Sequence, residues 1–326
     1  MIKIYDMETL EEREILFRGG SGADVSAPVA EILRAVQERG DAALREYTLR
    51  FDGAAPDALA VTAEEVDQAA AQVEPAFLAV LEEAAEHIRA YHARQKRESF
   101  VMTEREGVVL GQRIIPLARV GIYVPGGTAA YPSTVLMNAI PARIAGVGEI
   151  IMVTPPGRDG AVNPHILAAA KIAGVTRIYK VGGAQAVAAL AYGTGTIPQV
   201  DKIVGPGNAY VAEAKRQVFG RVNIDMIAGP SEVLVLADGR SNPAWVAADL
   251  LSQAEHDRMA AAVLVTDSRP LAEAVAHELE RQLAALPRAE IARASLEANG
   301  KLIVCRDLRE GIAVANRIAP EHLELC

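Results

Sequence analysis

From residue 113 onward, short apolar runs alternate with glycine- and proline-rich turns and with segments of helical periodicity. The strand candidates are residues 120–124, 150–154, 177–181, 202–204, 233–236, 261–266 and 301–305. Helices are expected between the later strands, over about residues 243–256, 270–298 and 308–318. Because a strand, a helix and a second strand in succession pack as a βαβ unit, this alternation predicts parallel sheets.

The part before residue 113 has a different pattern. Residues 28–51 and 63–98 carry apolar positions at helical spacing, and Thr62 with Glu65 is a helix start signal. A chain of 326 residues exceeds what one hydrophobic core usually holds, so two domains are expected. The apolar share of 51% with only 4% aromatic residues is typical of α/β enzymes with buried parallel strands. The predicted fold class is α/β, with two Rossmann-like parallel-sheet domains and a helical N-terminal segment.

Charge and cysteine content restrict the partners and the compartment. A net charge of -9 argues against nucleic acid as a partner. Cys305 and Cys326 are the only cysteines and cannot make a disulfide framework, which fits a reducing compartment. The N-terminus lacks a basic region followed by an apolar core, and no stretch reaches the length of a membrane span. We therefore expect a cytoplasmic protein that binds neither nucleic acid nor membrane.

Three glycine turns each lie between a predicted strand and a predicted helix, where backbone amides can meet phosphate: residues 124–127, 181–184 and 204–208. None is a Gly-x-Gly-x-x-Gly fingerprint, and one such turn alone is more commonly a tight connection. Three turns at corresponding sheet ends favour a nucleotide crevice. Tyr123 adjoins the first turn, while Gln185 and Asn208 are at the other two, although each taken singly is commonly a turn or capping residue.

Gln253 and His256 are one helical turn apart, near the end of a helix that Asn242 and Pro243 begin. Their side chains should leave the same helix face and reach one metal ion or one substrate. Imidazole nitrogen is a strong zinc ligand and amide oxygen a weak one, and a zinc site needs further donors. The alternative is a histidine that binds the last carbonyls of its helix.

Glu321 and His322 are adjacent on a predicted loop and supply two proton-transfer groups at one point. Imidazole titrates near neutrality, and partial burial can raise a glutamate pKa towards it, so the pair suits general acid–base catalysis. The alternative is an exposed Glu-His pair on a solvated loop. The apolar run that follows, residues 323–326, is typical of the opening of a strand.

Several motifs occur in a fixed order along the chain: residues 121–127 (GIYVPGG), 182–186 (GGAQA), 205–208 (GPGN), 228–232 (AGPSE), 253–256 (QAEH) and 319–323 (APEHL). In order and spacing, over essentially the whole chain, they resemble the histidinol dehydrogenase family. The resemblance implies a zinc enzyme of histidine biosynthesis. Such an enzyme oxidises L-histidinol to L-histidinal and then to L-histidine, using two NAD+ in succession.

The same resemblance implies a role for each candidate residue. Glu321 would activate water for attack on the aldehyde-level intermediate, and His322 would shuttle protons in both oxidations. The resemblance implies Gln253 and His256 as zinc ligands. It implies Tyr123, Gln185 and Asn208 as contacts to NAD. The implied substrate contacts are Ser231 together with Gln253, His256, Glu321 and His322.

Three parts of the chain are expected. Residues 1–20 form an N-terminal arm, and residues 21–119 plus 233–326 form a discontinuous first α/β domain with the catalytic and zinc motifs. Residues 120–232 form a second α/β domain with the NAD-contacting turns.

Members of the family continue past the Glu-His-Leu motif and draw an aspartate and a histidine zinc ligand from that continuation, which also completes a homodimer. We therefore expect a C-terminally incomplete relative that holds zinc weakly through two ligands.

Three alternatives stay open. One is a non-catalytic relative that keeps the fold but not the complete zinc site, and another is a relative that oxidises a different small alcohol. The third is a thiol-dependent aldehyde dehydrogenase whose nucleophile would be Cys305 or Cys326. Neither cysteine has the basic, loop-exposed setting that activates a thiolate, which argues against this third alternative.

Overall fold

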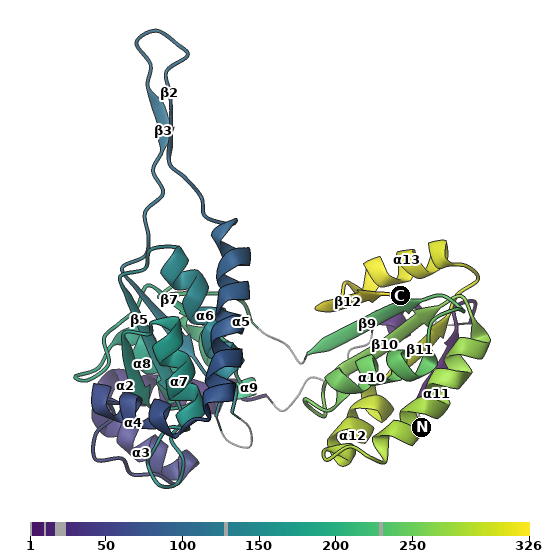
Figure 1. Cartoon of the computed structure of the whole chain (residues 1–326), viewed down its shortest axis with the longest axis horizontal. Helices are drawn as coiled ribbons and strands as arrows, with labels where there is room; N and C mark the ends of the chain where they lie inside the picture. The colour runs from purple at the N-terminus through teal and green to yellow at the C-terminus, as the bar shows by residue number, and fades with distance from the viewer. Residues whose placement is uncertain (1, 10, 17–23, 127–129, 228–230) are drawn as a thin grey trace. The chain divides into compact units, whose positions relative to one another are not determined.

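A computed structural model describes residues 2–9, 11–16, 24–126, 130–227 and 231–326 (Figure 1). The chain divides into two compact units, one of Met1–Ala23 with Gly229–Cys326 and the other of Asp24–Ala228. Each unit contains a five-stranded sheet whose neighbouring strands all run parallel. The predicted α/β class with two parallel-sheet domains is confirmed.

The sheet of the unit Asp24–Ala228 has the strand order β6-β5-β4-β7-β8. Its strands are β4 (Arg119–Tyr123), β5 (Glu149–Thr154), β6 (Arg177–Lys180), β7 (Lys202–Val204) and β8 (Asn223–Ile224). After β4, the next two strands, β5 and β6, lie on one side of β4, and the following two, β7 and β8, lie on its other side. The order of strands therefore reverses between β4 and β7, which is where ligands bind in open sheets of this kind.

Helices cover both faces of this sheet (Figure 1). On one face are α2 (Ser26–Arg39), α3 (Asp41–Asp52), α8 (Gly183–Tyr192) and α9 (Ala209–Val218); on the other are α4 (Ala63–Gln72), α5 (Pro75–Ala93), α6 (Pro132–Ile144) and α7 (Pro164–Ala173). In β5, Ile150 and Met152 enter one core while Ile151 and Val153 enter the other. Burial on both faces explains why these strands read as continuous apolar runs.

Residues 24–119 belong to this unit, and the predicted domain division differs from the structure in this respect. Helix α2 packs on α8 and α9, α4 packs on α7, and α5 packs on α6 and α7. The segment before α4 also runs along β6, where the Leu59 carbonyl accepts a hydrogen bond of 2.7 Å from the Lys180 N–H. Helical periodicity identifies an apolar face but not the sheet that buries it, so the sequence pattern could not assign these helices to a sheet.

An antiparallel hairpin of β2 (Phe100–Met102) and β3 (Leu110–Gln112) follows α5 and stands away from the sheet of its own unit in Figure 1. Its apolar side chains, including Val101 and Leu110, are exposed. The sequence pattern does not predict this hairpin, because its strands are short and lie between charged residues. By contrast, the start signal at Thr62 is confirmed, since the Thr62 and Glu65 side chains form a reciprocal capping box.

The sheet of the other unit has the order β1-β11-β10-β9-β12. Its strands are β1 (Lys3–Asp6), β9 (Glu232–Ala237), β10 (Ala261–Thr266), β11 (Lys301–Val304) and β12 (His322–Leu325). One face is covered by α10 (Pro243–Ala254), α11 (Arg269–Leu283) and α12 (Ala289–Asn299), and the other by α1 (Glu12–Leu16) and α13 (Leu308–Ile318).

Three local predictions need correction in this unit. The predicted arm contains an edge strand, β1, which pairs with β11; residues 1, 10 and 17–20 of that arm lie outside the described residues. The helix predicted over 270–298 is two helices, because Pro287 lacks an N–H and disfavours helical backbone at the residue before it. The predicted loop around Glu321 ends at His322, which begins β12 and lies opposite Val233 of β9.

Candidate active site

A cavity of about 370 Å³ lies at the carboxyl ends of β4, β5, β6 and β7. We call it the switch-point cavity; it is lined by Ile32, Phe51, Asp52, Tyr123, Gly126, Pro155, Gly183, Ala184, Gln185, Asn208 and Tyr210. Tyr123, Gln185 and Asn208, the residues predicted to contact NAD, therefore lie around one cavity. Gly127 of the first turn lies outside the described residues.

Gln185 lines this cavity from the first turn of α8 and is only 1% exposed. Neither its Oε1 nor its Nε2 has a hydrogen-bond partner within the part of the chain that the structure describes. A buried amide without partners costs about 1–3 kcal/mol, so such groups are normally satisfied. The Gln185 side chain is therefore arranged to bind a ligand that enters the cavity.

Two of the glycines predicted as turn residues are required by the backbone around the cavity. Gly183 has a φ of +66°, and a Cβ there would lie 2.5 Å from the Gln185 Oε1. Gly205 has a φ of +110°, and a Cβ there would lie 2.2 Å from the Tyr123 carbonyl oxygen. The left-handed backbone favours glycine at both positions, and at Gly205 the close approach of the Tyr123 backbone excludes any side chain.

Tyr123 and Asn208 are held by backbone amides. The Tyr123 hydroxyl accepts a 3.0 Å hydrogen bond from the Gly183 N–H, and burial raises the pKa of this phenol to about 12, so it stays protonated and can donate to a ligand. The Asn208 Oδ1 caps α9 by accepting from the Tyr210 and Val211 N–H groups at 3.1 and 3.2 Å. The cap uses the oxygen, and within the described residues the Asn208 Nδ2 has no partner and is available to a ligand.

Asp52 was not predicted as a site residue. It is the last residue of α3, and its Oδ2 is buried without a hydrogen-bond partner among the described residues. Burial raises the pKa of Asp52 to about 6. The sequence carries one signal that could have identified it, since a carboxylate in the last turn of a helix is electrostatically unfavourable.

We predict that Asp52→Asn stabilises the unit Asp24–Ala228 at pH 8. The pKa of Asp52 is higher in the folded state than its unfolded value of 3.8, so the carboxyl group favours folding most below about pH 4, and that stability is lost as pH rises through about 6. The substitution should raise the free energy of unfolding by about 1 kcal/mol at pH 8, a value reduced because the group is partly exposed, and by nearly zero at pH 4. Urea unfolding followed by circular dichroism at both pH values measures it. The exposed control Asp57→Asn should change stability little, and an equal gain at both pH values would contradict the prediction.

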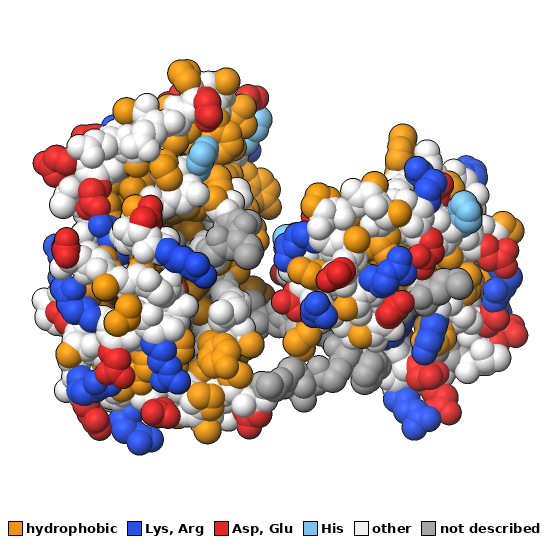
Figure 2. Space-filling view, turned by 90° about the horizontal axis from the view of Figure 1, so that it is seen from below, with side chains coloured by type: hydrophobic (Ala, Val, Ile, Leu, Met, Phe, Trp, Pro, Cys, Tyr) orange, Lys and Arg blue, Asp and Glu red, His pale blue; other side chains and the backbone are white. Residues whose placement is uncertain are grey.

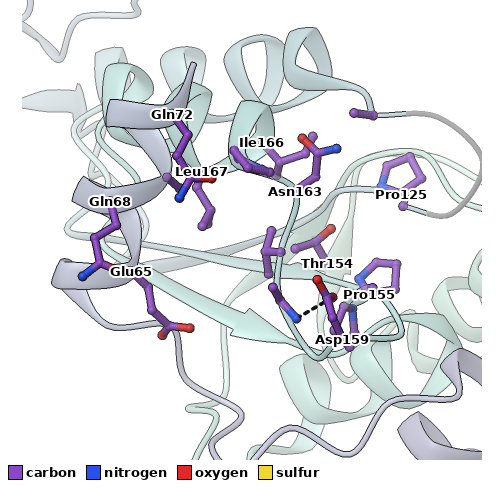
Figure 3. A pocket seen from close by; sticks show the side chains of 18 residues that line it. Glu65, Gln68, Gln72, Pro125, Thr154, Pro155, Asp159, Asn163, Ile166 and Leu167 are labelled. Carbon is purple, nitrogen blue, oxygen red and sulfur yellow. Dashed lines mark hydrogen bonds between the residues drawn. The ribbon is translucent and has the colours of Figure 1, made fainter. Parts of the chain in front are cut away.

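A second cavity, of about 680 Å³, adjoins the first and shares Gly126 and Pro155 with it. Figure 3 shows its polar wall, with Glu65, Gln68 and Gln72 from α4. Asn163 and Leu167 reach it from the α7 side, and Thr154 reaches it from the end of β5 (Figure 3). The two cavities together extend across the carboxyl ends of the sheet. This gives room for a ligand longer than one nucleoside.

The other predicted residues lie in the unit that contains Gly229–Cys326. Ser231 directly precedes β9, and its carbonyl accepts a 3.1 Å hydrogen bond from the N–H of Ala261, the first residue of β10. Glu321 directly precedes β12, and its Oε2 accepts a 3.3 Å hydrogen bond from the Glu232 N–H. These groups therefore gather at the amino-terminal edge of the sheet. Residues 228–230 of the AGPSE motif lie outside the described residues.

Gln253 and His256 are at the same edge, because α10 runs back from the end of β9 towards the start of β10. Helix α10 ends at Ala254, so His256 lies in the next turn, where its N–H donates a 3.1 Å hydrogen bond to the Gln253 carbonyl. Gln253 is 9% exposed and His256 is exposed. In the described residues, the His256 imidazole makes no hydrogen bond to the helix carbonyls, so the capping alternative finds no support.

The His256 imidazole nitrogen is a strong zinc ligand and the Gln253 amide oxygen a weak one, and two donors do not complete a site. Within the described residues, no group of three or more His, Cys, Asp or Glu side chains is placed to hold a metal ion. Gln253 and His256 can therefore supply part, and not all, of a zinc ligand set.

Glu321 and His322 are close and accessible. Their Oε1 and Nε2 atoms are 3.9 Å apart, and both side chains are about half exposed. Ala319, two residues earlier, has a φ of +47°, a left-handed conformation that is uncommon and strained outside glycine. Backbone strain of this kind is often found beside functional groups.

Neither cysteine has the environment of a catalytic thiol. Cys305 is buried, and burial together with nearby carboxylates raises the pKa of its thiol to about 11. Burial and repulsion from Asp249 and Glu324 also raise the pKa of Cys326. Both thiols are protonated near neutral pH, which counts against the aldehyde dehydrogenase alternative.

Comparison with known proteins decides the family. The sequence profile of histidinol dehydrogenase matches residues 18–326. The chain belongs to the histidinol dehydrogenase family. It is 60% identical over 297 residues to histidinol dehydrogenase of Geobacillus kaustophilus, an alignment that covers 91% of this chain and 70% of that protein. The corresponding enzyme of Syntrophotalea carbinolica is 59% identical over 303 residues, covering 92% and 70%.

The fold agrees with this assignment. The crystal structure of histidinol dehydrogenase from Elizabethkingia anophelis matches with a TM-score of 0.94 and 40% sequence identity, over 99% of this chain and 75% of that one. The chain is thus an oxidoreductase of the histidinol dehydrogenase family, whose reaction is the oxidation of histidinol in histidine biosynthesis. The recognition made from the sequence motifs is confirmed.

Two surface properties bear on partners. Among the described side chains on the face in Figure 2, basic and acidic groups are interspersed over both units, which does not resemble the basic surface of a nucleic-acid-binding protein. Among the described residues, no helix is both long and apolar enough to cross a bilayer.

Proposed function

We propose that the chain oxidises L-histidinol to L-histidine through L-histidinal, with NAD+ bound at the switch-point cavity and zinc bound by Gln253 and His256. When bound, NAD+ accepts a hydride in each of the two oxidations. The observation that most supports its place is the buried amide of Gln185, which has no partner in the described part of the chain. Beside it, Tyr123 offers a protonated phenol and Asn208 a free amide donor.

We assign proton transfer to the pair at the amino-terminal edge of β12. Each oxidation removes a proton from oxygen and a hydride from carbon, so a four-electron oxidation needs repeated proton removal at one centre. His322 is accessible and accepts these protons. Glu321, oriented by the Glu232 N–H, takes the proton from the water that adds to the aldehyde carbon. Ser231 lies at the same edge and binds the substrate.

Zinc would act at this edge as a Lewis acid that holds the amino and imidazole nitrogens of the substrate. Gln253 and His256 supply two of its ligands. Catalytic zinc normally has at least three protein ligands, and no group of three His, Cys, Asp or Glu side chains that could hold a metal occurs among the described residues, so these two ligands by themselves should hold zinc weakly.

We further propose a cytoplasmic homodimer. The β2–β3 hairpin and the segments beside it expose large apolar side chains, among them Val101, Val109, Leu110 and Ile115. Apolar side chains gathered on a projecting hairpin are typical of a protein–protein interface. Two free cysteines, one of them buried, fit a reducing compartment.

NADH formation from L-histidinol with added zinc tests the function, with the Geobacillus kaustophilus enzyme as positive control under the same conditions. Turnover by this chain, or NAD+ binding in calorimetry without turnover, supports the cofactor site. No binding and no turnover would instead favour a non-catalytic relative. Turnover of another amino alcohol in preference to L-histidinol would favour the altered-substrate alternative.

Gln185→Leu should weaken NAD+ binding by about 10-fold or more, because a charge-neutral hydrogen bond to a ligand contributes about 0.5–1.5 kcal/mol and the amide can make two. Leucine has similar volume and removes an unpartnered buried amide, so the fold should be as stable as before or more stable. Calorimetric titration with NAD+ measures the affinity. The matched control is Gln199→Leu, a residue outside the cavity lining; equal losses in both variants would argue against a specific contact.

A further inference from the structure

The switch-point cavity has one acidic group among its described lining residues, Asp52. We propose that Asp52 accepts hydrogen bonds from the ribose hydroxyls of the adenosine half of the dinucleotide and thereby selects NAD+ over NADP+. This inference rests on the proposed cofactor site and names a residue that sets its specificity.

The walls of the cavity suit a nucleoside. Ile32, Phe51 and Tyr210 present apolar and aromatic surface, on which a base can lie, while Gln185 and Asn208 offer polar groups. Asp52 lines the same cavity and directly follows Phe51 at the end of α3. A base and its ribose are also adjacent, so a base on Phe51 brings its sugar within reach of Asp52.

The carboxylate is suited to hydroxyl groups and not to phosphate. An ionised carboxylate accepts hydrogen bonds and donates none, so its natural partners are the two neighbouring hydroxyls of a ribose. The buried Oδ2 has no partner of its own in the described chain, and the group therefore has capacity for a ligand. A 2′-phosphate in the same place would bring two negative charges together in a partly buried site, where repulsion is strong.

The stability cost of Asp52 is consistent with a functional role. Burial without a partner raises its pKa to about 6, so at pH 8 the ionised group is held in an unfavourable environment. No described protein group offsets this. Residues that lower stability in this way are commonly kept for binding or catalysis.

Arg50 offers a rival outcome. Its guanidinium carbon lies 5.3 Å from the centroid of the Phe51 ring. A guanidinium beside the base could hold a 2′-phosphate and favour NADP+ instead. The two possibilities predict opposite preferences in the unmodified chain.

The test measures calorimetric affinities at pH 8 for four ligands: NAD+, NADP+, adenosine 5′-monophosphate and adenosine 2′,5′-bisphosphate. The two fragments differ only in the 2′-phosphate, so they isolate the ribose contact. The unmodified chain should prefer the monophosphate over the bisphosphate by about 100-fold, and NAD+ over NADP+ similarly. Asp52→Asn should reduce both preferences to less than about 10-fold and weaken monophosphate binding by about 10-fold. The control Asp57→Asn should change neither.

The outcomes separate the two claims. If the unmodified chain binds NAD+ but Asp52→Asn leaves both preferences unchanged, the inference fails while the cofactor site stands. If the unmodified chain binds the bisphosphate as tightly as the monophosphate, Asp52 does not exclude the 2′-phosphate and the inference again fails. If it binds the bisphosphate more tightly, the inference also fails and Arg50 is the better candidate for the 2′-phosphate contact. If neither NAD+ nor the monophosphate binds, the proposed cofactor site and the inference fall together.

Discussion

His322→Asn should lower kcat for NADH formation from L-histidinol by about 10²- to 10⁴-fold, the usual contribution of a general acid–base group. The asparagine keeps the size and polarity of the side chain but cannot take up a proton. Because the His322 side chain is more than half exposed, the fold should be unaffected. The exposed histidine of α11 in the same unit supplies a matched control, and His277→Asn should keep nearly full activity. A loss smaller than about threefold in His322→Asn would remove this residue from the mechanism.

Glu321→Gln should have a different signature. In the proposed mechanism, water is consumed only in the second oxidation, so the loss of its activating carboxylate should slow that step far more than the first. The number of NADH formed per L-histidinol should fall from two towards one, with L-histidinal detectable by a carbonyl-trapping reagent. An unchanged ratio together with a lower rate would mean that Glu321 serves both steps, or positions His322 only.

The sequence predicts strands of this chain well where both faces of a strand are buried. The runs at residues 202–204 and 261–266 match β7 and β10 in their bounds, because a strand between two helical layers needs apolar side chains on both sides. Edge and hairpin strands such as β1, β2 and β3 lack that requirement. Their composition is mixed, and their positions could not be read from the pattern.

The candidate site shows the same difference between local and long-range information. Tyr123 ends β4, and Gln185 and Asn208 come shortly after β6 and β7, so their meeting around one cavity follows from the parallel topology alone. Asp52 reaches the cavity from a helix that is distant in sequence. Its place depends on which sheet α2 and α3 cover, and helical periodicity does not contain that information. For the same reason, the sequence pattern assigned residues 24–119 to the domain of the other sheet, which is incorrect.

A buried ion pair supports the turn that carries Asn208, and breaking it should cost the most stability of any change considered. Lys215 of α9 is 2% exposed; its Nζ donates a 3.0 Å hydrogen bond to the Gly205 carbonyl and forms an ion pair with Asp225. The Asp225 Oδ2 in turn accepts a 2.8 Å hydrogen bond from the Gly205 N–H. Both backbone groups of Gly205 are thus bound by one pair of side chains.

Removal of either partner leaves the other charge without compensation, and the two losses should be unequal. Asp225→Asn leaves a buried ammonium and should cost about 3–5 kcal/mol, whereas Lys215→Met leaves a carboxylate that still contacts solvent and backbone amides and should cost less. The double variant should recover part of the loss, because neither charge then remains.

Hydrogen exchange of α8 and α9 peptides is the suitable measurement, because the single tryptophan, Trp245, lies in α10 of the other unit and would report on that unit alone. Arg216→Gln provides the neighbouring control: it removes an exposed pair with Glu213 and should cost less than about 1 kcal/mol. NAD+ affinity should fall in both single variants, because one of the two side-chain contacts that fix the Gly205 backbone, and with it the turn before Asn208, is then lost. If Lys215→Met proved as harmless as Arg216→Gln, the pair would not be what fixes this turn, and the placement of the Asn208 amide would have to come from its α9 cap alone.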